Sequence, residues 1–272
     1  MNDSDIPREQ KQTINRTKSR TIVGNPANGP VGVVTRQVPL QAETTLDSIG
    51  SFVTQGRYRL IAEVATGGMG KVYLADQLGV AGFEKTVGIK TIRRELVESP
   101  VFRSLFVEEA KLVADLVHEN IQQVYGLIEM GGAYAIVMEW VHGLTFEDIN
   151  TRLDELNDYL PPELAVFMVS RAARALAYAH TKRDRHGRLM QIVHRDVSPV
   201  NIFASWQGVV KLADFGIAKT VNLEAAEAEP NHIMGKVPYM SPEQALGKDT
   251  DARTDIFALG LILFEMLTGE QI

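Results

Sequence analysis

Cysteine is absent from this sequence of 272 residues. Disulfide bonds, thiolate metal sites and a cysteine nucleophile are therefore excluded for these residues, and the composition is compatible with a reducing cytosol. The first residues, Met1 to Asp5, also lack the basic and then apolar pattern of a secretory signal. Together these absences lead us to expect a cytoplasmic protein.

An excess of positive charge is also absent, because the formal net charge is -6 at pH 7. Binding along a phosphate backbone needs clustered Lys and Arg, so we expect no nucleic-acid partner. Long apolar runs are missing as well. The longest one, Ile256 to Leu267, is too short to cross a bilayer and contains Glu265, so we expect a buried helix there and no membrane segment.

A hydrophobic fraction of 45% is sufficient for a buried core over most of the chain, as one large domain or two small ones. Residues 1–56 differ from the rest, since they are rich in Thr and Ser, poor in aromatics and contain the breaker-rich run Gly24 to Pro30. Such a segment buries too little apolar surface to offset its ordering entropy, so we expect a disordered N-terminal tail. It could carry autophosphorylation sites or be a solvated leader, and the sequence favours neither.

The most informative stretch runs from Ile192 to Gly216. Its two apolar runs flank the polar residues Ser205 to Gly208, which predicts a strand hairpin. Asp196, Asn201 and Asp214 supply oxygen ligands around it, the kind that Mg²⁺ prefers and usually shares with substrate phosphates. This arrangement can place one base and two metal ligands around a polyphosphate.

The motifs His194-Arg195-Asp196, Asn201 and Asp214-Phe215-Gly216 resemble the catalytic and metal-binding loops of eukaryotic-like (Hanks-type) bacterial serine/threonine protein kinases. The resemblance covers residues 57–272 and implies an α+β, two-lobed fold. Residues 57–141 would form an N-lobe with a small antiparallel sheet, and residues 142–272 a helical but incomplete C-lobe. It further implies transfer of the ATP γ-phosphate to Ser/Thr hydroxyls of protein substrates in bacterial signalling, with Asp196 as the catalytic base and with Asn201 and Asp214 holding Mg²⁺ or Mn²⁺.

A glycine-rich segment with a strand on each side resembles the loop of this family that covers the phosphates, with Ala65 in place of its first glycine. Lys90 matches the strand lysine that holds the α- and β-phosphates, and Gly88 stands where alanine is usual. Met138 would guard the back of the adenine pocket. The resemblance assigns nucleotide contacts to Val64, Ala65, Thr66, Gly67, Gly68, Met69, Gly70, Lys71, Val72, Lys90, Glu139, Val141 and Phe203, with Glu139 and Val141 acting through their backbones.

Lys90 should pair with a carboxylate on the next predicted helix, over residues 102–117. Glu109 lies on the apolar stripe of that helix, where a glutamate is costly unless it is paired. Glu108 is a rival on geometry alone, and the resemblance selects Glu109. Further on, Pro162 to His180 predicts a helix whose buried stripe comprises Leu164, Phe167, Met168, Ala172, Ala175, Leu176 and Ala179.

Three other regions carry expectations. Lys182 to Gln191 is a basic insertion, which we expect to be an exposed loop. Asp255 matches the aspartate that anchors the catalytic loop from a buried helix. Residues between Asp214 and Glu243 match the activation segment of the family and contain few hydroxyl groups. They include Glu224, Glu227 and Glu229, which could replace an activating phosphate near Arg195 or form a solvated acidic loop.

Besides Ala65 and Gly88, two more residues depart from the family pattern. Ser198 stands where serine/threonine kinases usually have a lysine, and Lys236 stands where they have a threonine. The family's lower lobe also continues beyond the equivalent of Ile272, so we expect a truncated domain. These departures favour an alternative, an ATP-binding pseudokinase or signalling scaffold. The intact Lys90, Asp196, Asn201 and Asp214 favour the enzyme.

Overall fold

A computed structural model describes residues 52–53, 57–67, 70–91, 107, 110–130, 133–215 and 237–271. All of them belong to one unit of the chain, Ala42–Ile272. The predicted tail, residues 1–56, lies outside the described residues except for Phe52 and Val53.

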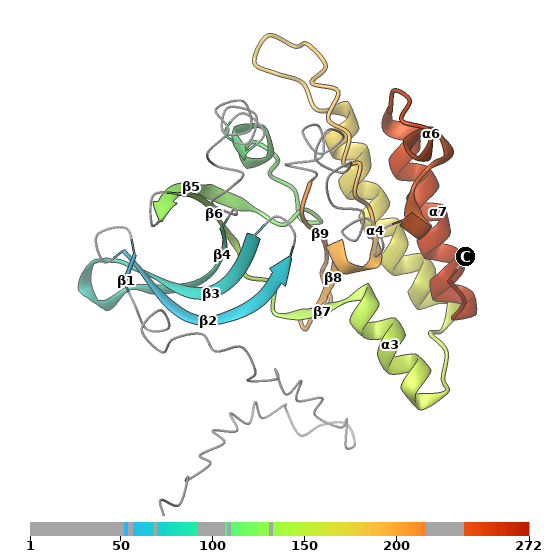
Figure 1. Cartoon of the computed structure of the whole chain (residues 1–272), viewed down its shortest axis with the longest axis horizontal. Helices are drawn as coiled ribbons and strands as arrows, with labels where there is room; N and C mark the ends of the chain where they lie inside the picture. The colour runs from blue at the N-terminus through green and yellow to red at the C-terminus, as the bar shows by residue number, and fades with distance from the viewer. Residues whose placement is uncertain are drawn as a thin grey trace, which may run out of the picture. The chain divides into compact units, whose positions relative to one another are not determined.

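An antiparallel sheet forms the first part of this unit (Figure 1). Its strands are β1 (Phe52–Val53), β2 (Tyr58–Gly67), β3 (Gly70–Leu78), β4 (Glu84–Thr91), β5 (Val124–Met130) and β6 (Ala133–Glu139), in the order β1-β2-β3-β4-β6-β5. The 3-10 turn η1 (Val80–Gly82) joins β3 to β4. Val87 and Ile89 of β4 are fully buried against Tyr58 and Leu60 of β2, so β4, the strand that carries Lys90, is fixed at the centre of the sheet.

Helices dominate the second part, where α4 and α7 lie side by side (Figure 1). The elements are β7 (Gly143–Thr145), α3 (Phe146–Leu156), α4 (Pro162–Thr181), η2 (Pro199–Asn201), β8 (Ile202–Ser205), β9 (Val210–Leu212), η4 (Val237–Tyr239), α6 (Pro242–Ala245) and α7 (Ala252–Thr268). Strands β7, β8 and β9 form a second antiparallel sheet, in that order. The predicted hairpin around Ser205 to Gly208 is therefore confirmed. The predicted boundary between residues 141 and 142 falls between β6 and β7 and stays a prediction.

Local capping explains where the long helices begin and end. Thr145 and Asp148 form a reciprocal capping box at the start of α3, which satisfies two backbone N–H groups that the helix leaves free. Asp251 accepts a hydrogen bond from the Arg253 N–H and caps α7. At its other end, Gly269 adopts φ 73°, the left-handed conformation that terminates many helices.

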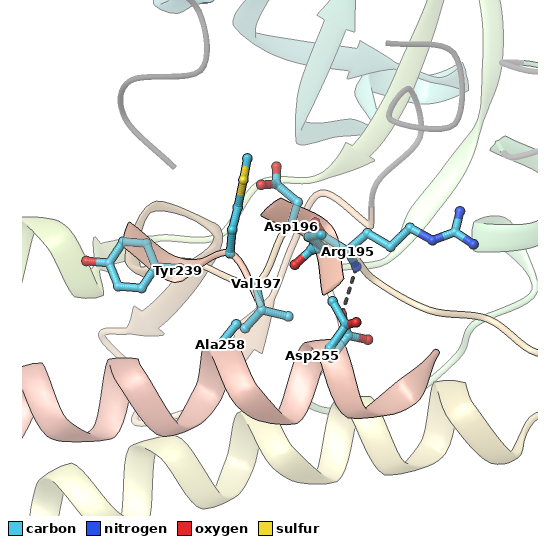
Figure 2. Close-up of a pocket in the computed structure, with 9 residues that line it drawn as sticks. Arg195, Asp196, Val197, Tyr239, Asp255 and Ala258 are labelled. Carbon is cyan, nitrogen blue, oxygen red and sulfur yellow. Dashed lines mark hydrogen bonds between the residues drawn. The ribbon is translucent and has the colours of Figure 1, made fainter. Parts of the chain in front are cut away.

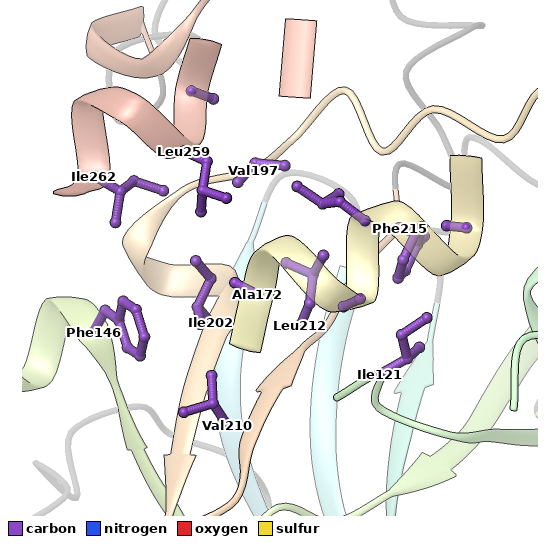
Figure 3. Packing of buried hydrophobic residues seen from close by; sticks show 14 of the residues in the cluster. Ile121, Phe146, Ala172, Val197, Ile202, Val210, Leu212, Phe215, Leu259 and Ile262 are labelled. Atoms are coloured by element: carbon purple, nitrogen blue, oxygen red, sulfur yellow. The ribbon is translucent and has the colours of Figure 1, made fainter. Parts of the chain in front are cut away.

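The main hydrophobic core lies between α4, α7 and the small sheet (Figure 3). Ile202 and Leu212 of the small sheet and Ile262 of α7 are fully buried in it. The predicted α4 is confirmed, but its predicted buried stripe is wrong at Leu164 and Phe167, which are 43% and 40% exposed. Small Ala165 and Val169 take the central positions, since short side chains let the helix approach its neighbours closely.

The prediction that the run from Ile256 to Leu267 is a buried helix is half correct. Thr254, Asp255, Ala258, Leu259, Ile262 and Met266 of α7 are buried. Its opposite face remains open among the described residues, with Ile256 53% exposed and Phe257 43% exposed. One side of α7 thus supports the core, and the other presents an apolar surface.

Candidate active site

The segment that carries Asp196 is anchored by one buried carboxylate. Asp255 of α7 accepts hydrogen bonds from the backbone N–H groups of His194 and Arg195, each at 2.8 Å. Figure 2 shows Asp255 rising from the helix toward this loop. The predicted anchoring role of Asp255 is therefore visible in the geometry. Because the carboxylate is 1% exposed, its bonds are made away from water and fix the loop tightly.

His194 joins the two predicted motifs. Its Nδ1 accepts the Asp196 N–H at 3.2 Å, and its Nε2 lies 2.9 Å from the Ala213 carbonyl oxygen. A carbonyl cannot donate, so Nε2 carries the proton and the ring is neutral. Complete burial lowers the pKa of His194, which favours the same neutral form. The ring also packs against Phe215, with centroids 4.5 Å apart.

Asn201 is oriented by the loop itself. Its side-chain Nδ2 donates to the Asp196 carbonyl at 2.7 Å, and its backbone carbonyl accepts the Ala213 N–H at 2.8 Å. Asn201 and Asp196 are both buried, at 4% and 8% exposure. Since the amide nitrogen is committed to the loop, the amide oxygen is the group of Asn201 suited to a hard cation.

Lys90 and Asp214 connect the large sheet to this loop. The Nζ of Lys90 lies 2.7 Å from Oδ1 of Asp214. Both side chains are partly exposed, at 22% and 36%, so a ligand can reach them. The predicted partner of Lys90, Glu109, lies outside the described residues, as does its rival Glu108. The pairing of Lys90 with Glu109 stays a prediction, and Asp214 is the partner that sequence reasoning did not propose.

The glycine-rich segment forms the turn between β2 and β3, where Gly67 pairs with Gly70. Gly68 and Met69 lie outside the described residues. Two residues flank this turn and bind each other across it, because Lys71 Nζ lies 2.9 Å from Glu63 Oε2. Hydrogen bonds from Thr66 and then Lys71 lower the pKa of Glu63, so the carboxylate stays charged and clamps the base of the turn.

The other predicted nucleotide contacts of this turn belong to the same hairpin. They are Val64, Ala65, Thr66 and Gly67 on β2 and Gly70, Lys71 and Val72 on β3. Phe203 lies on β8 and pairs with Thr145. Val72 lies opposite Lys90 in the pairing of β3 with β4. The roles of these residues in nucleotide binding stay predictions.

The strand that would face adenine has an unusual packing. Met138 is 8% exposed and fills the space beside Gly88, where an added Cβ would lie 3.2 Å from Met138 Cγ. The carbonyl of Glu139 accepts a hydrogen bond from Gln122 Nε2 at 2.9 Å. A carbonyl oxygen has a second lone pair, so adenine recognition at Glu139 would share this acceptor.

Three supporting residues were not identified from the sequence. His180 lies in the last turn of α4, and its Nε2 lies 2.8 Å from Asp255 Oδ2, a contact that its position does not predict. Gln244 Nε2 donates to the Arg195 carbonyl at 2.9 Å. Lys211 Nζ lies 3.0 Å from Glu139 Oε2 and ties β9 to β6. Each contact joins distant parts of the chain, so no local pattern signals it.

A pocket between the loop and α7 is lined by Arg195, Asp196, Val197, Tyr239, Met240, Gln244, Thr254, Asp255 and Ala258. In Figure 2 the Asp196 carboxylate points away from α7. Ser198 is 2% exposed nearby in sequence, and its hydroxyl has no hydrogen-bond partner among the described residues. Lys236, the other departure from the family pattern, lies outside the described residues, as do Glu224, Glu227 and Glu229.

A family model of the protein kinase domain matches residues 58–272. This chain belongs to the protein kinase family. The kinase domain is 40% identical over 213 residues to Tyrosine-protein kinase MasK of Myxococcus xanthus, an alignment that covers 78% of this chain and 33% of MasK. It is 37% identical over 214 residues to Serine/threonine-protein kinase PrkC of Bacillus subtilis, covering 79% of this chain and 31% of PrkC. The chain thus spans about a third of the length of these relatives.

The kinase domain is also similar to a solved structure, the PknI kinase domain of Mycobacterium tuberculosis. The TM-score is 0.61 at 27% identity, and the match covers 82% of this chain and 77% of the PknI chain. The predicted α+β, two-lobed kinase fold is therefore confirmed, as is the resemblance to bacterial serine/threonine kinases. In the part of the chain that the structure describes, no helix has the length and apolar character needed to cross a membrane.

Proposed function

We propose that this domain transfers the γ-phosphate of ATP to hydroxyl groups of protein substrates, as a serine/threonine kinase of bacterial signalling. The observation that carries the proposal is the Lys90–Asp214 contact at 2.7 Å, because it joins the large sheet to the predicted metal-binding motif Asp214-Phe215-Gly216. A cation from one side and a carboxylate from the other are what a metal-bound polyphosphate requires. Family membership implies the use of ATP and a divalent metal.

The residues fit a divalent cation. Asp214 offers a carboxylate and Asn201 an oriented amide oxygen, both hard ligands. No cluster of three or more His, Cys, Asp or Glu side chains suited to a metal ion occurs among the described residues. This agrees with a metal that takes its remaining ligands from phosphates and water. When bound, Mg²⁺ or Mn²⁺ would supply positive charge against the phosphate oxygens.

The roles of the protein groups follow from this arrangement. Asp196 accepts the proton of the acceptor hydroxyl while the new O–P bond forms and the bond to the ADP leaving group breaks. Lys90 binds phosphate oxygens, and the β2–β3 turn with its Lys71–Glu63 clamp covers them. Main-chain groups of Glu139 and Val141 bind adenine. All of these groups act mainly by positioning and charge, so they work as a unit.

The acceptor class depends on Ser198. A lysine at this position would place a cation beside the transferred phosphate, and the buried hydroxyl of Ser198 does not. One relative at 40% identity is named a tyrosine-protein kinase. Tyrosine is therefore a second candidate acceptor, and peptides that differ only in Ser, Thr or Tyr should be compared. Because ATP is the phosphoryl donor, we also propose that the domain acts in the cytoplasm.

The decisive experiment is transfer from radiolabelled ATP to peptide and to the protein itself, with Mg²⁺, with Mn²⁺ and with a chelator. The parent protein should label substrate only with metal, and Asp196→Asn should not label it. Nucleotide binding without transfer in the parent protein would instead support the pseudokinase alternative.

A further inference from the structure

The basic insertion Lys182–Gln191, expected as an exposed loop, is a hydrogen-bonded hairpin. Arg183 and Leu189 form an antiparallel bridge, and Met190 N–H donates to the Lys182 carbonyl at 2.9 Å. At the tip, the Gly187 N–H donates to the Asp184 carbonyl at 3.0 Å. In Figure 1 this segment projects beyond the end of α4. Its backbone is therefore held in a defined hairpin conformation.

The one acidic residue of the hairpin is used internally. The Asp184 carboxylate accepts the backbone N–H groups of His186 and Arg188 and the Arg188 Nε, at 2.8 to 2.9 Å. The backbone N–H of Arg188 is the main cause of the lowered pKa of Asp184, so this side chain remains a charged brace for the turn. Asp184 therefore fixes the hairpin and pairs with Arg188. The positive charge of the neighbouring Arg185 also helps to lower the pKa of Asp184, but no carboxylate among the described residues forms an ion pair with Arg183 or Arg185.

Arg183 and Arg185 are both exposed, and neither forms an ion pair with any described residue. Arg183 donates only to the Gly187 carbonyl, at 2.7 Å, which extends its guanidinium along the hairpin. Lys182 differs, because its Nζ donates to the Tyr178 hydroxyl at 2.9 Å. A chain with a net charge of -6 thus presents two exposed arginines that form no ion pair among the described residues, on a hydrogen-bonded hairpin that also carries the 47%-exposed Leu189.

The hairpin is also fixed relative to the catalytic loop. The helix that leads into it ends at Thr181, and His180 on that helix contacts Asp255 at 2.8 Å. The irregular segment that follows the hairpin leads to His194, whose backbone N–H donates to the same Asp255 oxygen at 2.8 Å. Both legs therefore meet at one carboxylate, so a chain bound to the hairpin would be held at a constant position relative to Asp196.

We propose that the Lys182–Gln191 hairpin docks an acidic segment of the protein substrate, with Arg183 and Arg185 as its charged contacts. This rests on the proposed kinase function, since the bound segment would be tethered to the acceptor. The charge pattern favours a short acidic peptide over a larger polyanion. Two arginines about 7 Å apart along an extended chain match a few carboxylates. Nucleic acid or an anionic membrane needs many more cations and would be repelled by the net negative chain.

The test uses the full 272-residue protein and two labelled peptides that share one Ser acceptor, one with a run of Glu and the other with Gln in its place. Binding is measured by fluorescence anisotropy, and KM and kcat by phosphate transfer. Arg183→Glu/Arg185→Glu should weaken binding of the Glu peptide about tenfold and raise its KM. The ratio of the affinity for the Glu peptide to the affinity for the Gln peptide should fall toward one. The lysine double variant, Arg183→Lys/Arg185→Lys, should keep most of the preference. Raising salt should reduce it in the parent protein.

Two controls keep the result specific. Arg185→Gln alone removes a positive charge without adding a negative one beside Asp184, and Arg185 forms no hydrogen bond among the described residues, so the bonds that Asp184 makes in the hairpin should remain. Arg152→Glu makes the same charge change on α3, where Arg152 pairs with Glu155, and should leave the peptide preference unchanged. If neither the parent protein nor any variant transfers phosphate, the kinase proposal fails. The binding data then still decide whether the hairpin docks an acidic peptide. Equal affinity of the parent for both peptides would overturn it. The proposal would also be overturned if the arginine variants lost affinity for single-stranded DNA or for phosphatidylserine vesicles but kept their affinity for the Glu peptide.

Discussion

Replacing Asp255 by asparagine tests how the catalytic loop is held. The carboxylate has three donors within 2.8 Å, namely the N–H groups of His194 and Arg195 and the ring Nε2 of His180. Asparagine has nearly the same shape but only one acceptor oxygen, because Nδ2 can only donate. The asparagine oxygen can still accept the Arg195 N–H. His180 can present an unprotonated Nε2 that accepts from the new amide Nδ2. The backbone N–H of His194 can only donate, so it loses its acceptor.

The expected cost follows from that single loss. A hydrogen bond to a charged acceptor contributes about 1.5–3 kcal/mol, and a buried donor left unpaired costs a similar amount. Asp255 and His194 are 1% and 0% exposed, so water does not replace the bond. Asp255→Asn should therefore lower the free energy of unfolding by about 2–3 kcal/mol. Because the loop carries Asp196, a small displacement should also reduce kcat by about 10²-fold.

Urea denaturation followed by circular dichroism measures the stability change, and radiolabelled ATP transfer measures kcat. Asp251→Asn is the matched control, since Asp251 caps the same helix from an exposed position and asparagine caps equally well. It should change stability by less than about 0.5 kcal/mol. If Asp255→Asn were as stable as Asp251→Asn, the three hydrogen bonds would not hold the loop and the reasoning would be wrong.

Three further predictions concern the site itself. Asp196→Asn should reduce transfer by 10²–10⁴-fold, about 3–5 kcal/mol, with ATP affinity and thermal melting nearly unchanged; residual turnover above a tenth of the parent would reject Asp196 as the base. Lys90→Met should raise the ATP requirement, and its effect should not add to that of Asp214→Asn; additive losses in the double variant would exclude a working pair. For His194, burial lowers the pKa, so the unfolded chain binds more protons below about pH 6.5, and stability is lost as pH falls below that value, by up to about 1.4 kcal/mol per unit. Urea melts at pH 7 and 5.5 should show a weaker pH dependence in His194→Gln, and equal dependence would refute this.

Sequence reasoning succeeded where the information was local. The hairpin of β8 and β9 follows from two β-branched runs around a polar turn, and α4 follows from its periodicity and its proline start. It failed at Leu164 and Phe167, where size suggested burial. The helix instead buries alanines, and Phe167 lies under Arg171, whose guanidinium carbon is 4.6 Å from the ring centroid. Which face of a helix is buried depends on the elements that pack against it, and the sequence of the helix alone does not specify these elements.

The supporting contacts were beyond the reach of local patterns for the same reason. Lys90 and Asp214 are 124 residues apart, and Asp255 and His180 are 75 apart. A resemblance identified Lys90, Asp214 and Asp255 as important, but not that Asp255 also contacts His180. The expectation that the basic insertion is an exposed loop is confirmed, since most of its residues are exposed and it has one isolated bridge. Its internal order could not be predicted, because it comes from Asp184 bonding to backbone N–H groups, and an aspartate in a polar run has no distinct pattern.

Backbone strain lies next to the proposed chemistry, and its location explains why distant contacts are needed there. Arg195 and Asp214 adopt φ of 60° and 55°, left-handed conformations that are costly for residues with a side chain. Each costs about 1–3 kcal/mol unless surrounding groups fix it. Asp255 fixes the first by accepting the Arg195 N–H, and Lys90 pairs with the second. α7 therefore holds the catalytic loop and the large sheet holds the Asp214 segment. Loss of the Asp255 contact should misplace Asp196 without a change at Asp196 itself, and loss of the Lys90 contact should displace Asp214.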